Sequence, residues 1–143
     1  MMSIQIKADD IRDEFEFLDD WEPRYAHIID LGKANPTLDA SERTEDNRVR
    51  GCASQVWMVS EFSGDHRMHI RAESDATIVS GLIALLVRLY SGETAEEILA
   101  FDAAGFLNEI GVAGALTAQR SNGLASMVAR IRGDAEAHLA VGQ

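Results

Sequence analysis

The stretch from Ala76 to about Tyr90 constrains the fold most, because it is apolar on almost every side of a helix. Its aliphatic residues recur at helical spacing, at Ile78, Val79, Leu82, Ile83, Leu85, Leu86 and Leu89. A helix that is apolar nearly all round is buried in a core rather than laid on a surface. We therefore expect the rest of the chain to pack around it, with Ser74 and Asp75 capping its start and Gly92 ending it.

Two predicted strands precede this helix. Residues 55–62 carry apolar side chains on both faces, which predicts partial burial of both faces. Residues 63–65 form a turn, and residues 66–73 then alternate apolar and polar side chains, as a strand with one buried face does. The inward side chains are those of Met68, Ile70 and Ala72. Val49 and its neighbours predict a short third strand.

Helices are expected both before and after these strands in the sequence. Asp9 and Asp10 open a first one, and Asp20 caps a second that Gly32 and Pro36 stop. The later ones are a short helix capped by Thr94 and Glu97, a helix at 103–110, and a last helix after residues 116–123 with Leu124, Met127, Val128, Ile131 and Leu139 inward. Strands that do not alternate with helices predict an α+β fold, a small antiparallel sheet packed against helices.

The chain is long enough for one domain, which we place at 1–143 with a core of about 9–140. Residues 34–51 form a long polar connection, which is uncommon unless the segment is functional or disordered. With 24 acidic against 13 basic residues, the net charge is −11, which argues against a nucleic-acid partner. Residues 1–7 lack the apolar core of a signal peptide, and no apolar run spans a membrane. We expect a cytoplasmic protein.

A single cysteine, Cys52, is the main candidate for chemistry. One thiol forms no internal disulfide and cannot hold an iron–sulfur cluster by the usual set of thiolates. Arg48 and Arg50 precede it, and positive charge favours the reactive thiolate. Gly51 leaves room for the backbone of a partner. The competing interpretation is that Cys52 is a buried small hydrophobe, as free cysteines often are.

Two further features have alternative interpretations. His66 and His69 would lie on opposite faces of a strand, so no metal site is predicted there. Arg120 stands at the start of the last helix, where the helix dipole disfavours a cation. It is either an ordinary surface arginine or a contact for a partner.

Several motifs in a fixed order resemble the SufE family of sulfur-acceptor proteins, which includes the CsdE proteins. The resemblance runs from about Phe15 to Ile131. It rests on Asp20-Trp21-Glu22-Pro23-Arg24-Tyr25, Ile29-Asp30-Leu31-Gly32, Asn47-Arg48-Val49-Arg50-Gly51-Cys52, Ser54-Gln55-Val56-Trp57, Ser74-Asp75-Ala76, Ile78-Val79, Gly81-Leu82-Ile83-Ala84-Leu85, Phe101-Asp102 and Arg120-Ser121-Asn122-Gly123-Leu124. The chain departs from the family at Ala53, where glutamine is usual.

The resemblance implies a function. Such proteins accept sulfane sulfur from the persulfide of a cysteine desulfurase like SufS or CsdA, hold it on a cysteine that matches Cys52, and pass it to an iron–sulfur scaffold complex. The cofactor, pyridoxal phosphate, belongs to the desulfurase, so this chain needs none. The fold would be SufE/IscU-like, although the scaffold proteins carry three cysteines. The residues expected to contact the partner are Arg48, Arg50, Gly51, Ser54, Gln55, Asp75 and Arg120.

Five arginines, at positions 43, 48, 50, 67 and 71, are expected near the Cys52 loop and its sheet, as a basic docking region on an otherwise acidic chain. Two alternatives stay open. One is a thiol-dependent enzyme acting on a small molecule, which needs a histidine or an acid beside Cys52. The other is a regulatory binding module in which Cys52 is structural. The resemblance itself implies a sulfurtransferase-type partner that carries a cysteine persulfide intermediate, rather than an independent enzyme.

Overall fold

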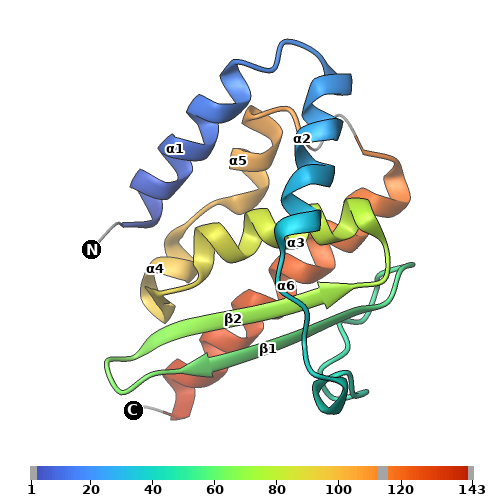
Figure 1. Cartoon of the computed structure of the whole chain (residues 1–143). Coiled ribbons are helices and arrows are strands. Elements are labelled where there is room, and N and C mark those ends of the chain that lie inside the picture. The colour runs from blue at the N-terminus through green and yellow to red at the C-terminus, as the bar shows by residue number, and fades with distance from the viewer. Residues whose placement is uncertain (1–2, 113–115, 142–143) are drawn as a thin grey trace.

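The computed structural model describes residues 3–112 and 116–141. These residues form, in chain order, α1 (Ile4–Glu16), α2 (Trp21–Ala34), the 3-10 helix η1 (Ala40–Glu42), β1 (Val56–Phe62), β2 (Arg67–Ser74), α3 (Thr77–Tyr90), β3 (Glu93–Thr94), α4 (Ala95–Ala100), α5 (Ala103–Glu109) and α6 (Ala118–Val141). Figure 1 shows the long hairpin of β1 and β2 with α1 to α5 on one side of it, while α6 passes behind the two strands. The predicted α+β fold with an antiparallel sheet is confirmed.

Helix α3 is the central buried helix, as its sequence predicts. It contacts α1, α2, α6 and β2, and all of its predicted inward residues are at most 7% exposed. The helix starts at Thr77, and the Ser74 hydroxyl accepts a hydrogen bond from the Ala76 amide at 3.2 Å. Asp75 does not cap α3 as predicted, because its carboxylate accepts from the Gln55 amide at 3.1 Å instead. Gly92 follows the helix with φ of +90°.

The crossing of α2 and α3 explains why α2 ends later than the sequence predicts. We expected Gly32 to stop the second helix, yet α2 continues through Gly32 to Ala34. A β-carbon on Gly32 would lie 2.7 Å from the backbone nitrogen of Gly81 in α3, and one on Gly81 would overlap the carbonyl oxygen of Ile28. The two glycines therefore let the two helix backbones touch, which outweighs the poor helix propensity of glycine.

The sheet has the order β1-β2-β3, with both pairs antiparallel. The hairpin register runs from Val56 opposite Ser74 to Phe62 opposite Met68. The short strand expected around Val49 is reduced to an isolated antiparallel bridge between Arg48 and Trp57, beside a hydrogen bond from the Val49 amide to the Val56 carbonyl at 2.8 Å. The third strand of the sheet is instead β3, which follows α3 and pairs with β2.

The two faces of the hairpin are buried as their side-chain pattern predicts. Val56 and Met58 of β1, with the alternate apolar residues of β2, are at most 3% exposed and belong to the hydrophobic core. Trp57 and Val59 on the opposite face are half-buried. One strand face therefore packs on the helices, while the other is covered only in part.

Helix α1 begins earlier than predicted. It starts at Ile4, and the Ser3 hydroxyl caps it by accepting from the Ile6 amide at 3.3 Å. The extra turns are held by Lys7, whose ammonium group lies 2.5 Å from the buried carboxylate of Glu93 in β3. This pairing joins segments far apart in sequence, so the spacing of apolar residues gives no sign of it.

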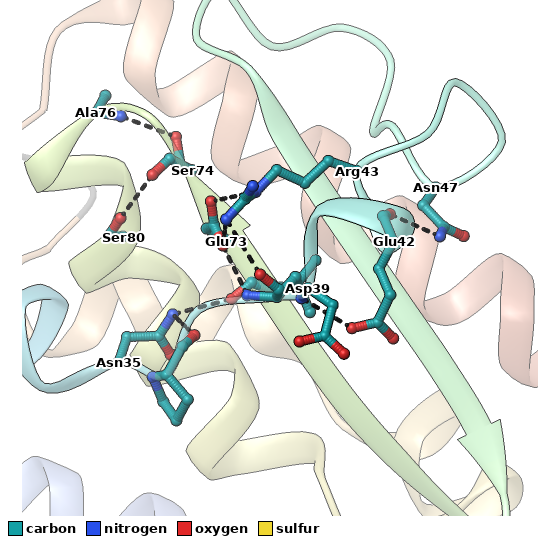
Figure 2. Close-up of polar contacts among 12 residues, drawn as sticks. Asn35, Asp39, Glu42, Arg43, Asn47, Glu73, Ser74, Ala76 and Ser80 are labelled. Atoms are coloured by element: carbon teal, nitrogen blue, oxygen red, sulfur yellow. Dashed lines mark hydrogen bonds and ion pairs between the residues drawn. The ribbon is translucent and has the colours of Figure 1, made fainter.

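The polar connection between α2 and β1 is ordered along β2 (Figure 2). The Asn35 amide donates to the Ala72 carbonyl at 2.9 Å, and the Glu73 carboxylate accepts from the Leu38 amide at 2.6 Å and from the Arg43 guanidinium at 2.8 Å. Asn47 donates to the Glu42 carbonyl at 2.9 Å. The connection therefore supports the loop that carries the cysteine.

The later helices follow their predicted caps. The Thr94 hydroxyl accepts from the Glu97 amide at the start of α4, and Gly111 follows α5 with φ of +81°. Helix α6 starts at Ala118, earlier than predicted, so Arg120 and Gly123 lie within its first turns. None of the described helices is both long enough and apolar enough to cross a membrane.

Candidate functional site

Cys52 lies in the loop between the Arg48 bridge and the start of β1, against the first turns of α6. Its thiol is half-buried and donates a weak hydrogen bond to the Gly123 carbonyl, with 3.5 Å between sulfur and oxygen. Gly51 has φ of +87°, and a β-carbon there would clash with the Ser126 hydroxyl. Glycine at this position therefore lets the loop turn tightly against α6.

A cavity of about 150 Å³ opens beside the thiol. Val79 of α3 and Met127 of α6 supply apolar walls, and Ser54, Gln119 and Arg120 supply polar groups. Of the described residues, those that line the cavity include neither a histidine nor a carboxylate. The site therefore offers room and positive charge beside a thiol, but no base to activate it.

Arg120 is brought to the cavity by the first turn of α6. Its guanidinium donates to the Tyr25 hydroxyl of α2 at 3.2 Å, and its backbone amide donates to the Thr117 hydroxyl at 3.3 Å. The hydrogen bond to Tyr25 restrains the Arg120 side chain, which would otherwise move freely in solvent. The predicted neighbourhood of Arg120 and Cys52 is therefore present in the structure.

The state of the thiol differs from the sequence-based prediction. Burial raises the pKa of the Cys52 thiol, and the positive charge of Arg48 offsets only part of that rise. Arg50 is three-quarters exposed and lies 3.2 Å from the Glu45 carboxylate, which also faces Arg48 at 3.8 Å. Arg48 therefore favours the thiolate as expected, whereas Arg50 does not contribute, and burial outweighs Arg48, so that the neutral thiol is preferred in the free protein.

The expected basic region is largely neutralised. Arg43 pairs with Glu73 at 2.8 Å, and Arg71 pairs with Glu42 at 2.5 Å. Arg67 pairs with Asp65 at the turn of the hairpin. Cys52 lies near the opposite end, where Val56 pairs with Ser74. Arg67 therefore lies in the sheet, as expected, but at the end away from Cys52, where it adds no charge beside the thiol.

The remaining predicted site residues support the loop. Ser54 lines the cavity, while Gln55 and Asp75 join the start of β1 to the chain just before α3 through the hydrogen bond described above. Ala53 is exposed at the cavity rim. His66 and His69 lie apart, the first facing His138 and the second Ser63. Within residues 3–112 and 116–141, no three metal-binding side chains gather in one place.

The sequence of this chain matches a known protein family. Residues 9–135 match the SufE family, described as the Fe-S metabolism associated domain. The chain belongs to the SufE family. An uncharacterized SufE-like protein of Rhizobium etli is 51% identical over 135 residues, covering 92% of this chain and 91% of that protein. A second, from Rhizobium meliloti, is 46% identical over 134 residues, covering 92% and 96%.

A solved structure shares the fold of this SufE-family chain. The solution structure of a hypothetical protein from Thermus thermophilus superposes with a TM-score of 0.77, covering 94% of this chain and 96% of the other. The two sequences are 20% identical, so this likeness concerns the fold alone.

Sequence reasoning on this SufE-family chain missed several contributors to the site. The Gly123 carbonyl is a backbone group, and no side-chain pattern identifies it. Val79 and Met127 were assigned to the core or to a helix face, although both also wall the cavity. Tyr25 belongs to the motif that opens α2, and only the fold reveals its hydrogen bond to Arg120.

Proposed function

We propose that this SufE-family chain is a sulfur carrier that accepts sulfane sulfur on Cys52 from a cysteine desulfurase and delivers it for iron–sulfur cluster assembly. The observation that carries the proposal is that the chain's sole thiol lies beside a cavity with an arginine at its wall. The family's association with Fe-S metabolism agrees with it. The direct test is whether Cys52 gains sulfur from a desulfurase persulfide.

The transfer is an exchange between sulfur atoms. The Cys52 thiolate attacks the outer sulfur of the desulfurase persulfide, and a new S–S bond forms on Cys52 while the donor's S–S bond breaks. The donor cysteine leaves as a thiolate with the electron pair, so no outside oxidant or reductant is needed. Pyridoxal phosphate acts in the desulfurase, in forming the donor persulfide.

The geometry of the site protects the Cys52 thiol from solutes between encounters with partner proteins. A neutral, half-buried thiol that donates to the Gly123 carbonyl reacts slowly with solutes, because the thiolate is the nucleophile. Attack on a partner's persulfide requires the Cys52 loop to shift outward and the proton to leave. The apolar walls of Val79 and Met127 then give the product persulfide a place sheltered from reductants.

The other two functions are less well supported. A thiol enzyme needs a base or an acid beside its nucleophile, and the described residues that line the cavity supply neither. A purely structural cysteine would be expected to fill the core, whereas Cys52 borders an open cavity. Both points favour a carrier whose activating groups come from its partner.

The two arginines near Cys52 should affect its reactivity differently. Alkylation by iodoacetamide should rise with pH through an inflection above that of a free cysteine, about 8.5. Arg48→Gln should move the inflection to still higher pH, because Arg48 stabilises the thiolate. Arg50→Gln is the matched control and should leave the inflection unchanged, because its charge faces Glu45. Equal shifts for both variants, or an inflection below 8.5, would contradict this account.

Arg120 should serve the encounter with the desulfurase rather than the fold. Arg120→Glu should raise the concentration that half-saturates desulfurase stimulation by roughly tenfold, which corresponds to about 1.4 kcal/mol of binding free energy. The thermal midpoint and the alkylation rate of Cys52 should stay close to wild type. The measurement is desulfurase turnover against concentration at low and high salt. A variant that matches wild type at both salts would show that Arg120 does not contact the partner.

A further inference from the structure

Two large aromatic side chains are exposed where α1 ends and α2 begins. Phe17 is 86% exposed and Trp21 is 57% exposed. Exposed aromatic residues bring no stability from burial, but they are the side chains that most often anchor a protein–protein interface. We call this corner of the molecule, residues 13–22, the aromatic corner.

The aromatic corner is strongly acidic. Its exposed carboxylates that form no ion pair with another described residue are those of Asp13, Glu16, Asp19, Asp20 and Glu22. Asp20 caps α2, but α1 has no basic residue in its last turn to balance Asp13 and Glu16. Carboxylates near a helix C-terminus are destabilising, so these two are not explained by the stability of α1.

The aromatic corner is continuous with the cysteine site. The rings of Trp21 and Tyr25 pack edge to face with 6.1 Å between centroids, and the Tyr25 hydroxyl accepts from Arg120 at the cavity. Figure 1 shows the first turn of α6 between α2 and the loop that leads into β1. A standard interface covers about 800 Å² on each partner, so a protein docked over Cys52 can also cover this corner.

We propose that the aromatic corner is part of the surface that docks the cysteine desulfurase, and this rests on the function proposed above. The desulfurase would offer an apolar socket for Phe17 and Trp21 with lysine or arginine side chains around its rim. The aromatic side chains supply affinity, and the carboxylates supply orientation and rate of encounter. The arginines beside Cys52 are largely paired with acids of this chain, so the aromatic corner carries the stronger uncompensated charge.

Charge argues against two other occupants. A second copy of this chain carries a net charge of −11, and a symmetric contact would place the acidic corner against itself. An anionic lipid surface would be repelled for the same reason. The desulfurase is favoured because its approach to Cys52 already brings a protein surface to Arg120.

The test compares two pairs of exposed apolar residues. Phe17→Ser with Trp21→Ser should raise the Kd for the pyridoxal-phosphate-loaded desulfurase by tenfold or more, as loss of interface anchors does. Ile6→Ser with Val141→Ser is the matched control, because these side chains are 48% and 86% exposed and lie elsewhere. Binding is measured by calorimetry, and sulfur transfer at saturating concentration should be unchanged in both pairs.

A charge arm completes the test. Asp13→Asn with Glu16→Gln and Asp19→Asn should weaken binding at low salt and have less effect at high salt, where screening is strong. The proposal is overturned if both pairs bind the desulfurase as wild type does, or if only delivery to the scaffold is impaired. Because binding is measured apart from transfer, weakened binding in the first pair supports the aromatic corner even if wild type gains no sulfur, an outcome that refutes only the carrier function.

Discussion

Gly81→Val should destabilise the protein by about 3 kcal/mol or more, at or above the upper end of usual overpacking costs. A β-carbon at this position would overlap the Ile28 carbonyl oxygen and lie 2.7 Å from its carbonyl carbon. Backbone cannot rotate away as a flexible side chain can, so α2 and α3 would have to separate. That separation would open the core at the helix that contacts α1, α2, α6 and β2. The measurement is the free energy of unfolding in urea.

Gly133→Ala is the matched control for this prediction. Gly133 is exposed within α6, and a β-carbon there would meet nothing within 4 Å. Alanine should therefore stabilise the protein by about 0.5–1 kcal/mol through its better helix propensity. If Gly81→Val cost no more than about 1 kcal/mol, the close crossing of α2 and α3 would be wrong.

The sequence predicts much of this fold because its main signals are local. The run of aliphatic residues in α3 permits only burial, and strict alternation in β2 fixes which side chains face the core. Asp20 and Thr94 occupy helix starts, where their side chains accept backbone hydrogen bonds.

The errors arise where distant segments meet. Gly32 continues a helix because another glycine, Gly81, lies against it, and only the tertiary crossing shows this. The strand β3 contains Glu93, a buried acid whose partner Lys7 comes from α1. Neither contact has a signature in the local pattern of apolar residues, so β3 was not predicted as a strand of the sheet.

The residues of the site could be predicted where the signal is local, and could not be predicted where it depends on tertiary contacts. Cys52 and Arg120 could be identified from the sequence, and the fold brings both to one cavity. The direction of the pKa shift of the Cys52 thiol could not be predicted, because the two neighbouring arginines in the sequence do not show how deeply the thiol is buried. Burial outweighs the charge of Arg48, and Glu45 faces Arg50.

Loss of the thiol should abolish sulfur loading completely. Cys52 is the only cysteine in the chain, so no second thiol can take over the transfer within it. Cys52→Ser keeps nearly the same side-chain volume, and serine can still donate to the Gly123 carbonyl, so the fold should survive. A hydroxyl at neutral pH is far too weak a nucleophile to attack a persulfide. The variant should therefore still bind the desulfurase while accepting no sulfur from it.

The intact mass of the protein, recorded without reductant after incubation with the desulfurase and free cysteine, tests the central claim most directly. Wild type should gain one sulfur atom or more, and a thiol reductant should remove the gain. Cys52→Ser should show no gain under the same conditions. An equal gain in the variant, or none in wild type while the desulfurase turns over, would contradict the role proposed for Cys52.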